Sequence, residues 1–398
     1  MTGNLLILAV LIRLLIMPFY FHPDIKTYNF QASFLKQGVL DIYSYLEKNK
    51  DRFPIKEEFV YFPLTYFFLG GYQILISPIL GPNFTNWLSD ASAKSVETIG
   101  IYRYLFLLKL PYLFLDILTG FLLTLFFTSR QQKRKAFIFW LFNPFSIILI
   151  YIYSNVDIIP VVLLVLSLYL VKKEKFISSA LLLGVAAGFK AFPLLLLPFL
   201  IMFGRTAKEK LLILFTALAT FTLIVFPFLG QDAFQKSTLI SGLTTRIVSS
   251  GLNIGFGEML LPAIIALSAL FFYTSMTQKG EIYEYWLLAF LLIFSSIHFH
   301  IQWLLWIAPL LVILSIEKPQ FTKPMLILIL LIFSIPLLYQ DSYMTVGLFN
   351  AISPLFSSLP TPATILQKVY DPYAFSSILH SMLLGGSLIF GWRLRNLR

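Results

Sequence analysis

The chain has 398 residues, of which 58% are hydrophobic and 12% charged, with a net charge of +11 and a mean hydropathy of +0.82. Soluble domains carry roughly 25% charged residues, so this composition predicts an all-α polytopic membrane protein with a single integral-membrane domain, 1–398. The absence of cysteine excludes disulfides, a thiol nucleophile and Cys-ligated zinc. The positive charge is scattered over short loops, an orientation signature of membrane proteins that argues against nucleic acid as a partner.

Apolar runs of the chain predict about twelve membrane helices. They cover 4–21, 101–128, 136–153, 156–171, 175–189, 191–204, 210–229, 258–277, 283–299, 301–316, 323–340 and 373–392. The start, Met1 to Tyr20, lacks a basic n-region and a small-residue cleavage site, so we interpret it as a retained helix and not a signal peptide. The basic loops are expected on the cytoplasmic side, at 130–135, 172–175, 205–210, 318–323 and 393–398.

A further apolar run, 61–80, lies inside a long first outer loop, 21–100. Four helix-breaking residues predict that this run is a re-entrant or interfacial pair and not a full span: Pro63, Gly70, Gly71 and Pro78. With that choice every basic loop and both termini lie on the cytoplasmic side, provided that residues 176–204 cross twice by turning near Lys190. The remaining regions are a core bundle, 101–316, and C-terminal helices, 317–398.

The first candidate for chemistry is Asp24, which lies within a turn of the predicted end of the first span. A partly desolvated carboxylate at a membrane boundary is costly, which favours a functional role over a folding role. A general base at this position could remove a proton from an acceptor hydroxyl, and an apolar wall would raise its basicity. The alternative is a hydrated carboxylate at the end of a helix.

The long outer loop supplies further candidates for binding a sugar or an acceptor, because loops of that size in a compact protein are usually functional. The aromatic segment that begins at Tyr61 could stack on the apolar faces of a sugar ring, or could belong to an interfacial aromatic belt. His22, Lys26 and Tyr28 flank Asp24 and are assigned to the same sugar or acceptor site.

Three outer-facing cations, Lys190, Arg246 and Arg103, are candidates for holding a lipid phosphate at the membrane surface. Lys190 lies between two half-helices, which favours a phosphate role over simple snorkelling to the interface. No nucleotide-binding Gly-x4-Gly-Lys-Ser/Thr loop occurs, and no Gly-x-Gly-x-x-Gly follows a strand. A nucleotide-bound donor in a soluble domain is therefore not predicted.

Two histidines, His298 and His300, lie with Gln302 at a predicted outer turn. Residues at i and i+2 do not share a helical face, so the two rings are poor joint metal ligands in a helix. In a turn they could ligate a metal together with Asp24 or Asp157. Our preferred interpretation has no cofactor, with His300 bonding to phosphate and with His298 and Gln302 bonding to sugar or acceptor.

Two further acids have structural alternatives. Asp157, with Asn155, either caps an outer turn or binds sugar hydroxyls as an outer-face acid. Asp116 and Arg13 both lie roughly 14–18 Å from the cytoplasmic ends of their predicted helices. Equal depth predicts a buried ion pair between them, which lowers the cost of inserting each charge.

The ordered set of these segments resembles the GT-C superfamily of integral-membrane glycosyltransferases. The matching segments are His22-Pro23-Asp24, Tyr61-Phe62-Pro63-Leu64-Thr65, Tyr102-Arg103 with Lys109, Pro111 and Asp116, Phe142-Asn143-Pro144, Asn155-Val156-Asp157, Phe189 to Pro193, and His298 to Trp306. They cover about the first 310 residues in order. Phe62 replaces a proline of the related Tyr-Pro-Pro-Leu-Thr pattern, and the first motif holds one acid where some members have two.

The resemblance is greatest to polyprenol-phosphate-mannose-dependent mannosyltransferases, including the enzyme that adds the first mannose to glycosylphosphatidylinositol. It implies a GT-C-like bundle, a polyprenyl-phosphate sugar donor, a lipid or glycan acceptor, and a luminal or periplasmic site. It also implies an inverting displacement with Asp24 as base, while Lys190 and Arg246 hold the departing phosphate. Many such enzymes work without metal.

Two other classes remain open at the level of the sequence. A lipid-linked-sugar flippase or other transporter shares the span count, but is expected to show inverted repeats and polar residues at the midplane. A non-catalytic membrane scaffold would not need Asp24 and Lys190 near one cavity. The lack of cysteine and of a retrieval tail favours the plasma membrane of a prokaryote over the endoplasmic reticulum.

Overall fold

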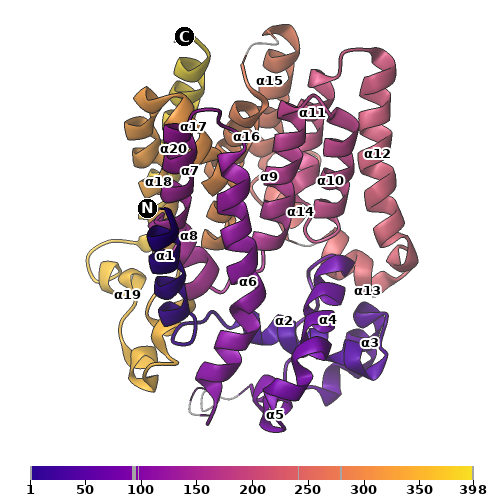
Figure 1. Ribbon diagram of the computed structural model, residues 1–398, viewed down its shortest axis with the longest axis vertical. Helices are drawn as coiled ribbons and strands as arrows, with labels where there is room; N and C mark the ends of the chain where they lie inside the picture. The colour runs from indigo at the N-terminus through magenta and orange to yellow at the C-terminus, as the bar shows by residue number, and fades with distance from the viewer. Residues whose placement is uncertain (1, 92–95, 97, 241, 278–279, 397–398) are drawn as a thin grey trace.

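A computed structural model describes residues 2–91, 96, 98–240, 242–277 and 280–396, so residues 397 and 398 of the basic tail lie outside it. Most of the described residues are helical, and strand is limited to one short hairpin among them, which confirms the all-α class. Figure 1 shows a bundle of upright helices above a lower group of shorter ones. By length and composition, five of the described helices could cross a membrane, or six if one bent pair counts as a single span.

The bundle is built from the longer helices of the chain. These are α1 (Thr2–Ile16), α6 (Ile101–Thr124), α7 (Arg130–Leu141), α8 (Pro144–Ile147), α9 (Ile158–Lys172), α10 (Phe176–Ala187), α11 (Leu197–Phe203), α12 (Ala207–Val225), α15 (Pro262–Thr277), α16 (Ile282–Ser296), α17 (Ala308–Glu317), α18 (Thr322–Leu337) and α20 (Pro372–Asn396). Each of the twelve predicted apolar runs overlaps one of these helices. The number of membrane crossings stays a prediction.

The lower group and the connections hold the remaining elements, most of them short, although Pro63–Leu80 is long and apolar enough to cross a membrane. The lower group is α2 (Asp24–Ala32), α3 (Ile42–Asn49), α4 (Pro63–Leu80) and α5 (Asn83–Ser89). Three short helices are α13 (Asp232–Phe234), α14 (Leu243–Ser249) and α19 (Pro362–Leu366). The 3₁₀ and π turns are η1 (Ser33–Gln37), η2 (Lys50–Arg52), η4 (Ile148–Ile152), η5 (Phe192–Leu196), η6 (Phe226–Phe228), η7 (Gln235–Leu239), η8 (Ile301–Trp306), η9 (Pro319–Phe321), η10 (Ser342–Met344), η11 (Val346–Phe349) and η12 (Pro354–Ser358).

The predicted break within 61–80 is wrong, because α4 is one continuous helix. Pro63 occupies the start of that helix, where its missing N–H breaks no bond. Gly70 serves a close contact and not a turn: a Cβ there would lie 2.7 Å from the Leu35 Cβ. The Leu64 N–H donates to the Gly188 carbonyl at 3.0 Å, which joins the beginning of α4 to the bundle.

Two other predicted helices differ from the observed ones, one at its start and one by a bend within it. The run that begins at 258 starts as a hairpin, in which β1 (Leu252–Gly255) pairs antiparallel with β2 (Glu258–Leu260) before α15 begins at Pro262. Gly255 and Gly257 take the positive φ angles of its turn. The run 136–153 is two segments bent by 42° between α7 and α8, because Pro144 at the break cannot continue the helical bonding.

The centre of the bundle is α16, in which every residue from Ile282 to Ser295 is buried. The following segment, Ile301–Leu314, is buried as well. A helix that is apolar all round requires neighbours on every side. By contrast, α12 and α20 bury only 22% of their most apolar windows and expose rows of large apolar side chains, as expected for helices that face lipid.

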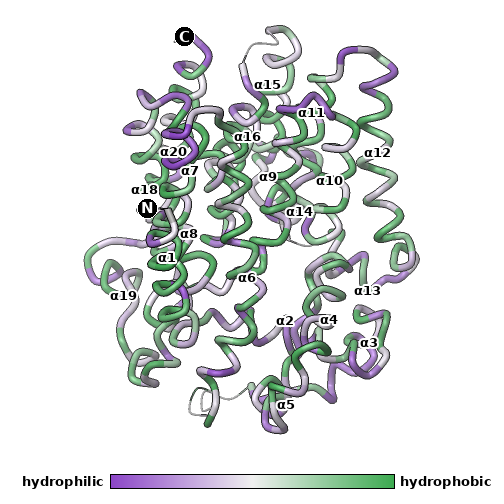
Figure 2. Tube along the Cα trace, in the orientation of Figure 1, coloured by the Kyte–Doolittle hydropathy of each residue, from purple (hydrophilic) through white to green (hydrophobic). Residues whose placement is uncertain are grey.

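The basic loops lie together at one end of the molecule. Figure 2 shows hydrophilic segments at the upper end, where α12 begins and α20 ends. Side-chain contacts join these loops to one another: Lys172 bonds to the Phe126 carbonyl and to Glu317 at 3.7 Å, and Arg205 bonds to Glu174. The α20 end of the chain lies at this upper end and the N-terminus near mid-height (Figure 1), and their cytoplasmic placement stays a prediction.

The predicted pair of Arg13 and Asp116 is confirmed. The Arg13 Nε lies 2.5 Å from the Asp116 Oδ2, and both side chains are fully buried. Tyr151 and Trp140 also donate to this carboxylate, each at 2.7 Å. One carboxylate therefore ties α1, α6, α7 and η4 together.

Sequence reasoning did not assign a role to Lys109, which is fully buried on α6. Its Nζ donates to the carbonyls of Met17 and Tyr151, each at 2.8 Å, and also to that of Tyr20. These bonds satisfy the last turn of α1 and hold the chain that leads to Asp24 against α6.

Replacing Asp116 by Asn should destabilise the protein by about 3–5 kcal/mol, because Arg13 would be left buried without a countercharge. The measurement is the midpoint of thermal unfolding in detergent. The double variant R13M/D116N, which removes both charges, should unfold at a higher temperature than D116N alone. Equal midpoints for the wild type and D116N would contradict a structural ion pair.

Candidate functional site

Asp24 begins α2 directly after the His22-Pro23 turn. Its Oδ1 lies 3.2 Å from the His22 Nδ1, and its Oδ2 accepts a hydrogen bond of 3.2 Å from the Gln302 Nε2. A carboxylate in the first turn of a helix also complements the helix dipole. The side chain stays 29% exposed, so it is held by its neighbours and still open to a ligand.

The charge state of Asp24 differs from the prediction that an apolar wall would raise its basicity. Burial does act to raise the pKa of this carboxyl, but the adjacent His22 and the hydrogen bond from Gln302 act against it. The result is a pKa well below the ordinary value for Asp. The side chain is therefore an ionised carboxylate at neutral pH, in the form that accepts a proton.

A cavity of about 370 Å³ opens beside Asp24. Segments far apart in the chain supply its walls, namely the first turn of α2, residues 60–62, the turn that follows α10, the stretch 238–247 and the turn that leads into η8. The predicted site residues that line it are Asp24, Tyr28, Tyr61, Lys190, Arg246, His300 and Gln302. The structure thus brings most of the candidates to one place.

Lys190 projects into this cavity but is already paired. Its Nζ lies 2.8 and 2.9 Å from the two carboxylate oxygens of Asp157, which is fully buried. The Trp306 Nε1 donates to the same carboxylate at 2.7 Å. The Lys190 ammonium also lies 5.0 Å from the Tyr61 ring centre and 5.3 Å from that of Trp306, within the range of cation–π attraction.

Asp157 accordingly has a different place from either predicted one. Its side chain makes no helix cap, although it stands at the start of α9, and the Asn155 Oδ1 accepts its backbone N–H at 2.9 Å instead. Because the carboxylate is fully buried behind Lys190, it does not line the cavity where a sugar would bind.

Arg246 is the cavity cation for which the described residues provide no carboxylate. It lies on α14, where its Nη1 donates to the His298 carbonyl at 3.0 Å. Its guanidinium lies 5.2 Å from the Trp303 ring centre. Burial acts to lower its pKa, with Tyr339 opposing, yet an arginine stays charged at neutral pH. Arg246 is therefore better prepared than Lys190 to receive an anion.

The two histidines of the predicted outer turn, His300 and His298, have different surroundings. The His300 ring lies 5.5 Å from that of His22, edge to face, and burial together with nearby positive groups lowers its pKa to about 3. His300 is thus neutral at physiological pH. The His298 ring instead stacks on Tyr339 at 4.2 Å and does not line the cavity, so this residue contributes only its carbonyl.

Two tyrosines form the wall nearest Asp24. The Tyr28 and Tyr61 rings meet edge to face at 4.6 Å. Burial and the nearby carboxylates raise the pKa of both phenols, so each keeps its proton and can donate it in a hydrogen bond.

Lys26 and Arg103 lie away from the cavity. The Lys26 ammonium bonds to the Asp90 carbonyl and lies 5.5 Å from the Trp87 ring centre, and burial lowers its pKa to about 8. The Arg103 Nη2 donates to the Leu80 carbonyl at 3.0 Å. Lys26 thereby joins α2 to the end of α5, and Arg103 joins α6 to the end of α4.

Several residues that line the cavity were not predicted as site residues, among them Trp306 and Thr238. Trp306 holds Asp157 in place, and Thr238 lines the cavity while its Oγ1 donates to the Phe59 carbonyl at 3.2 Å. The signal for Trp306 was its spacing of three from Trp303, since residues three apart share a face in a 3₁₀ helix. The two indoles indeed stack at 4.8 Å. No sequence signal indicated Thr238.

The arrangement also bears on metal binding. Among the residues that the structure describes, no group of three or more His, Cys, Asp or Glu side chains is close enough to hold an ion. His22 and His300 lie near Asp24, but polar groups of the protein already bond to all three side chains. The Asp24 N–H donates to the His22 Nδ1, the Gln302 N–H to the His300 Nδ1, and the Gln302 Nε2 to the Asp24 Oδ2.

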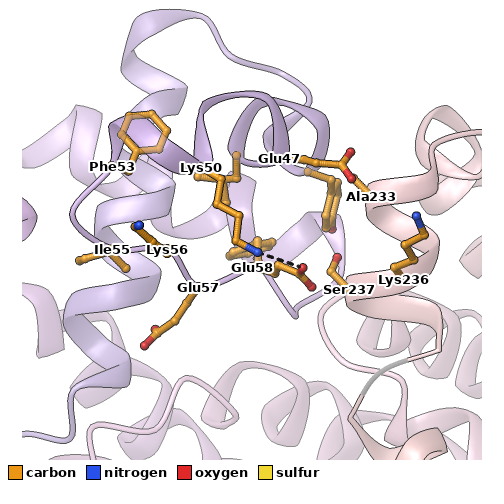
Figure 3. Close-up of a pocket in the computed structure, with 13 residues that line it drawn as sticks. Glu47, Lys50, Phe53, Ile55, Lys56, Glu57, Glu58, Ala233, Lys236 and Ser237 are labelled. Carbon is orange, nitrogen blue, oxygen red and sulfur yellow. Dashed lines mark ion pairs between the residues drawn. The ribbon is translucent and has the colours of Figure 1, made fainter.

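A second cavity, of about 220 Å³, lies between the segments 43–59 and 233–237 (Figure 3). Two segments of the chain line both cavities in turn. Residues 55–59 line the second cavity and residues 60–62 the first, and residues 236–237 line the second cavity and residues 238–239 the first. The Tyr43 hydroxyl, from the second cavity, donates to the Tyr61 carbonyl at 2.7 Å. Charged side chains of both signs surround this cavity, namely Glu47, Lys50, Lys56, Glu57, Glu58 and Lys236.

Comparison with known proteins gives one partial likeness. Over 108 residues the chain is 33% identical to GPI mannosyltransferase 1 of Candida albicans (strain SC5314 / ATCC MYA-2876). The match covers 26% of this chain and 27% of that protein, so it spans about a quarter of each. No protein-family model matches the chain, and no solved structure matches it.

Proposed function

We propose that the protein is a membrane glycosyltransferase that moves a hexose, with mannose as the proposed sugar, from a polyprenyl-phosphate donor to an acceptor hydroxyl. The observation that carries the proposal is that Asp24 and Arg246 line one cavity, and that none of the described carboxylates pairs with Arg246. Its lining residues belong to turns that the sequence predicts on the outer side of the membrane. The partial likeness to a mannosyltransferase supports the same reaction class.

The reaction begins with the acceptor hydroxyl bound beside Asp24. The hydroxyl oxygen attacks the anomeric carbon of the sugar while Asp24 takes its proton, and a new glycosidic bond forms. The bond between that carbon and the phosphate oxygen breaks, and the electron pair leaves with the polyprenyl phosphate. Attack opposite the leaving group inverts the configuration. The phosphate leaves as a stable anion, so no general acid is needed.

The other cavity residues have supporting roles in this proposal. Arg246 binds the donor phosphate, because none of the described carboxylates neutralises this cavity cation. Lys190 adds a weaker attraction and, through Asp157, fixes the turn that follows α10. His22 and Gln302 hold the carboxylate of Asp24 in one orientation. Tyr28, Tyr61 and Trp303 provide ring faces and edges for the sugar.

Replacing Asp24 by Asn should leave the protein folded and lower turnover by roughly 10²–10⁴-fold, the usual contribution of a general base. The assay measures radiolabel that purified protein in liposomes transfers from polyprenyl-phosphate-mannose to membrane lipids or glycans. Asp41→Asn is the matched control, since Asp41 caps α3 outside the cavity and Asn caps equally well. Movement of intact donor across the bilayer without transfer would instead indicate a flippase.

Replacing Arg246 by Gln should raise the KM for the donor by roughly 10–100-fold, because a charge-assisted bond to phosphate contributes about 1.5–3 kcal/mol. Arg103→Gln is the matched control and should leave the donor KM unchanged, since Arg103 does not line the cavity. Equal effects of the two substitutions would remove Arg246 from the phosphate site.

Replacing His22 by Gln should move the acidic limb of the kcat/KM profile to higher pH. In the wild type His22 lowers the pKa of Asp24, and without it burial acts with less opposition and raises that pKa. A base with a higher pKa becomes protonated sooner as the pH falls, so activity is lost at a higher pH. His298→Gln should keep the wild-type profile, and a profile unchanged in both variants contradicts the assignment.

A further inference from the structure

The beginning of α7 carries a cluster of positive charge that the protein itself does not balance. Arg130, Lys133 and Arg134 line one hollow of about 700 Å³ with Phe121 and Phe137. These cations stand at i, i+3 and i+4 on α7, with Phe137 at i+7, so they share one face of the helix. Phe121 on α6 supplies the facing wall, and its ring lies 4.9 Å from that of Phe137.

No acidic residue lines this hollow. The sequence contains no Asp or Glu between Asp116 and Asp157, and the Asp116 carboxylate is committed to Arg13 in the core. Among the described residues, no ion pair involves Arg130, Lys133 or Arg134. The three like charges lie within about one turn of the helix and repel one another. A bound anion would reduce this repulsion.

The other basic loops differ in this respect, because each contributes a cation to an ion pair. The pairs are Lys172 with Glu317 at 3.7 Å, Arg205 with Glu174, Lys318 with Glu284 at 2.8 Å, and Arg395 with Glu284 at 3.0 Å. A general need for positive charge at this end of the molecule therefore does not explain why the α7 loop alone lacks an acidic partner.

The position of the hollow favours a lipid over a soluble anion. The bond from Lys172 to the Phe126 carbonyl places the α6–α7 connection beside the other basic loops, at one end of the apolar bundle. The hollow combines cations with apolar walls: Phe121 is 48% exposed and sits just below the charges. A phospholipid presents the complementary pair, an anionic phosphate above an acyl chain, and basic pockets between membrane helices bind such headgroups.

We propose that this hollow, formed by Phe121, Arg130, Lys133, Arg134 and Phe137, is a binding site for an anionic phospholipid. The phosphate lies among the three cations, and the upper part of one acyl chain rests on the two phenyl rings. The site is separate from the cavity beside Asp24 and does not depend on the reaction that the protein catalyses.

Native mass spectrometry of the purified full-length protein in detergent tests the proposal, with phosphatidylglycerol and phosphatidylcholine as probes. The wild type should retain phosphatidylglycerol in preference to phosphatidylcholine. The variant R130Q/K133Q/R134Q should bind phosphatidylglycerol roughly 100-fold more weakly, since each surface cation contributes about a factor of five. The variant R205Q/K208Q/K210Q removes the same charge from a neighbouring loop and should bind as the wild type does.

Equal losses in the two triple variants would overturn the site, because they would indicate attraction to net charge alone. Absence of a preference for phosphatidylglycerol in the wild type would overturn it as well. Binding of inorganic phosphate to the three cations without retention of phosphatidylglycerol would show a site for a soluble anion instead. Should the triple variant fail to fold, Lys133→Gln alone should give a smaller loss of about fivefold, and no loss there contradicts the proposal.

Discussion

The candidate site depends on one buried carboxylate, that of Asp157. A charged group removed from water is tolerated only when partners satisfy it, and Lys190 and Trp306 do so from two separate turns of the chain. The same contacts set the position of the Lys190 ammonium over three aromatic rings. The bonds to Asp157 therefore fix the positions of Lys190 and Trp306 on the cavity wall. Asp24 and Arg246, which line the same cavity, face a preorganised surface.

The same constraint organises the rest of the bundle. The Asp116 carboxylate joins four elements through Arg13, Trp140 and Tyr151, and Lys109 gathers carbonyls at the end of α1. These buried polar groups lie between the basic end of the molecule and the cavity. They connect α1, which leads to the first motif, to α6, α7 and η4.

Hydrophobic runs located the helices, and equal depth paired Arg13 with Asp116, because both follow from the geometry of a single helix. Packing between elements was not accessible in this way. Gly70 indicated a break, whereas it allows close approach of Leu35. Lys190 and Asp157 were both placed at outer turns, but only the fold reveals that they bond to each other. Lys26 and Arg103 resembled ligand-binding cations, yet nearby carbonyls hold them elsewhere.

The partition between the two outer cavities is a single layer of chain. A phenol from one side, Tyr43, holds the carbonyl of Tyr61, whose ring lines the opposite side, and Thr238 holds Phe59 in the same layer. Anything that shifts Tyr43 thereby loosens the backbone behind the other compartment. The two cavities therefore share a wall whose position depends on side chains from both of its faces.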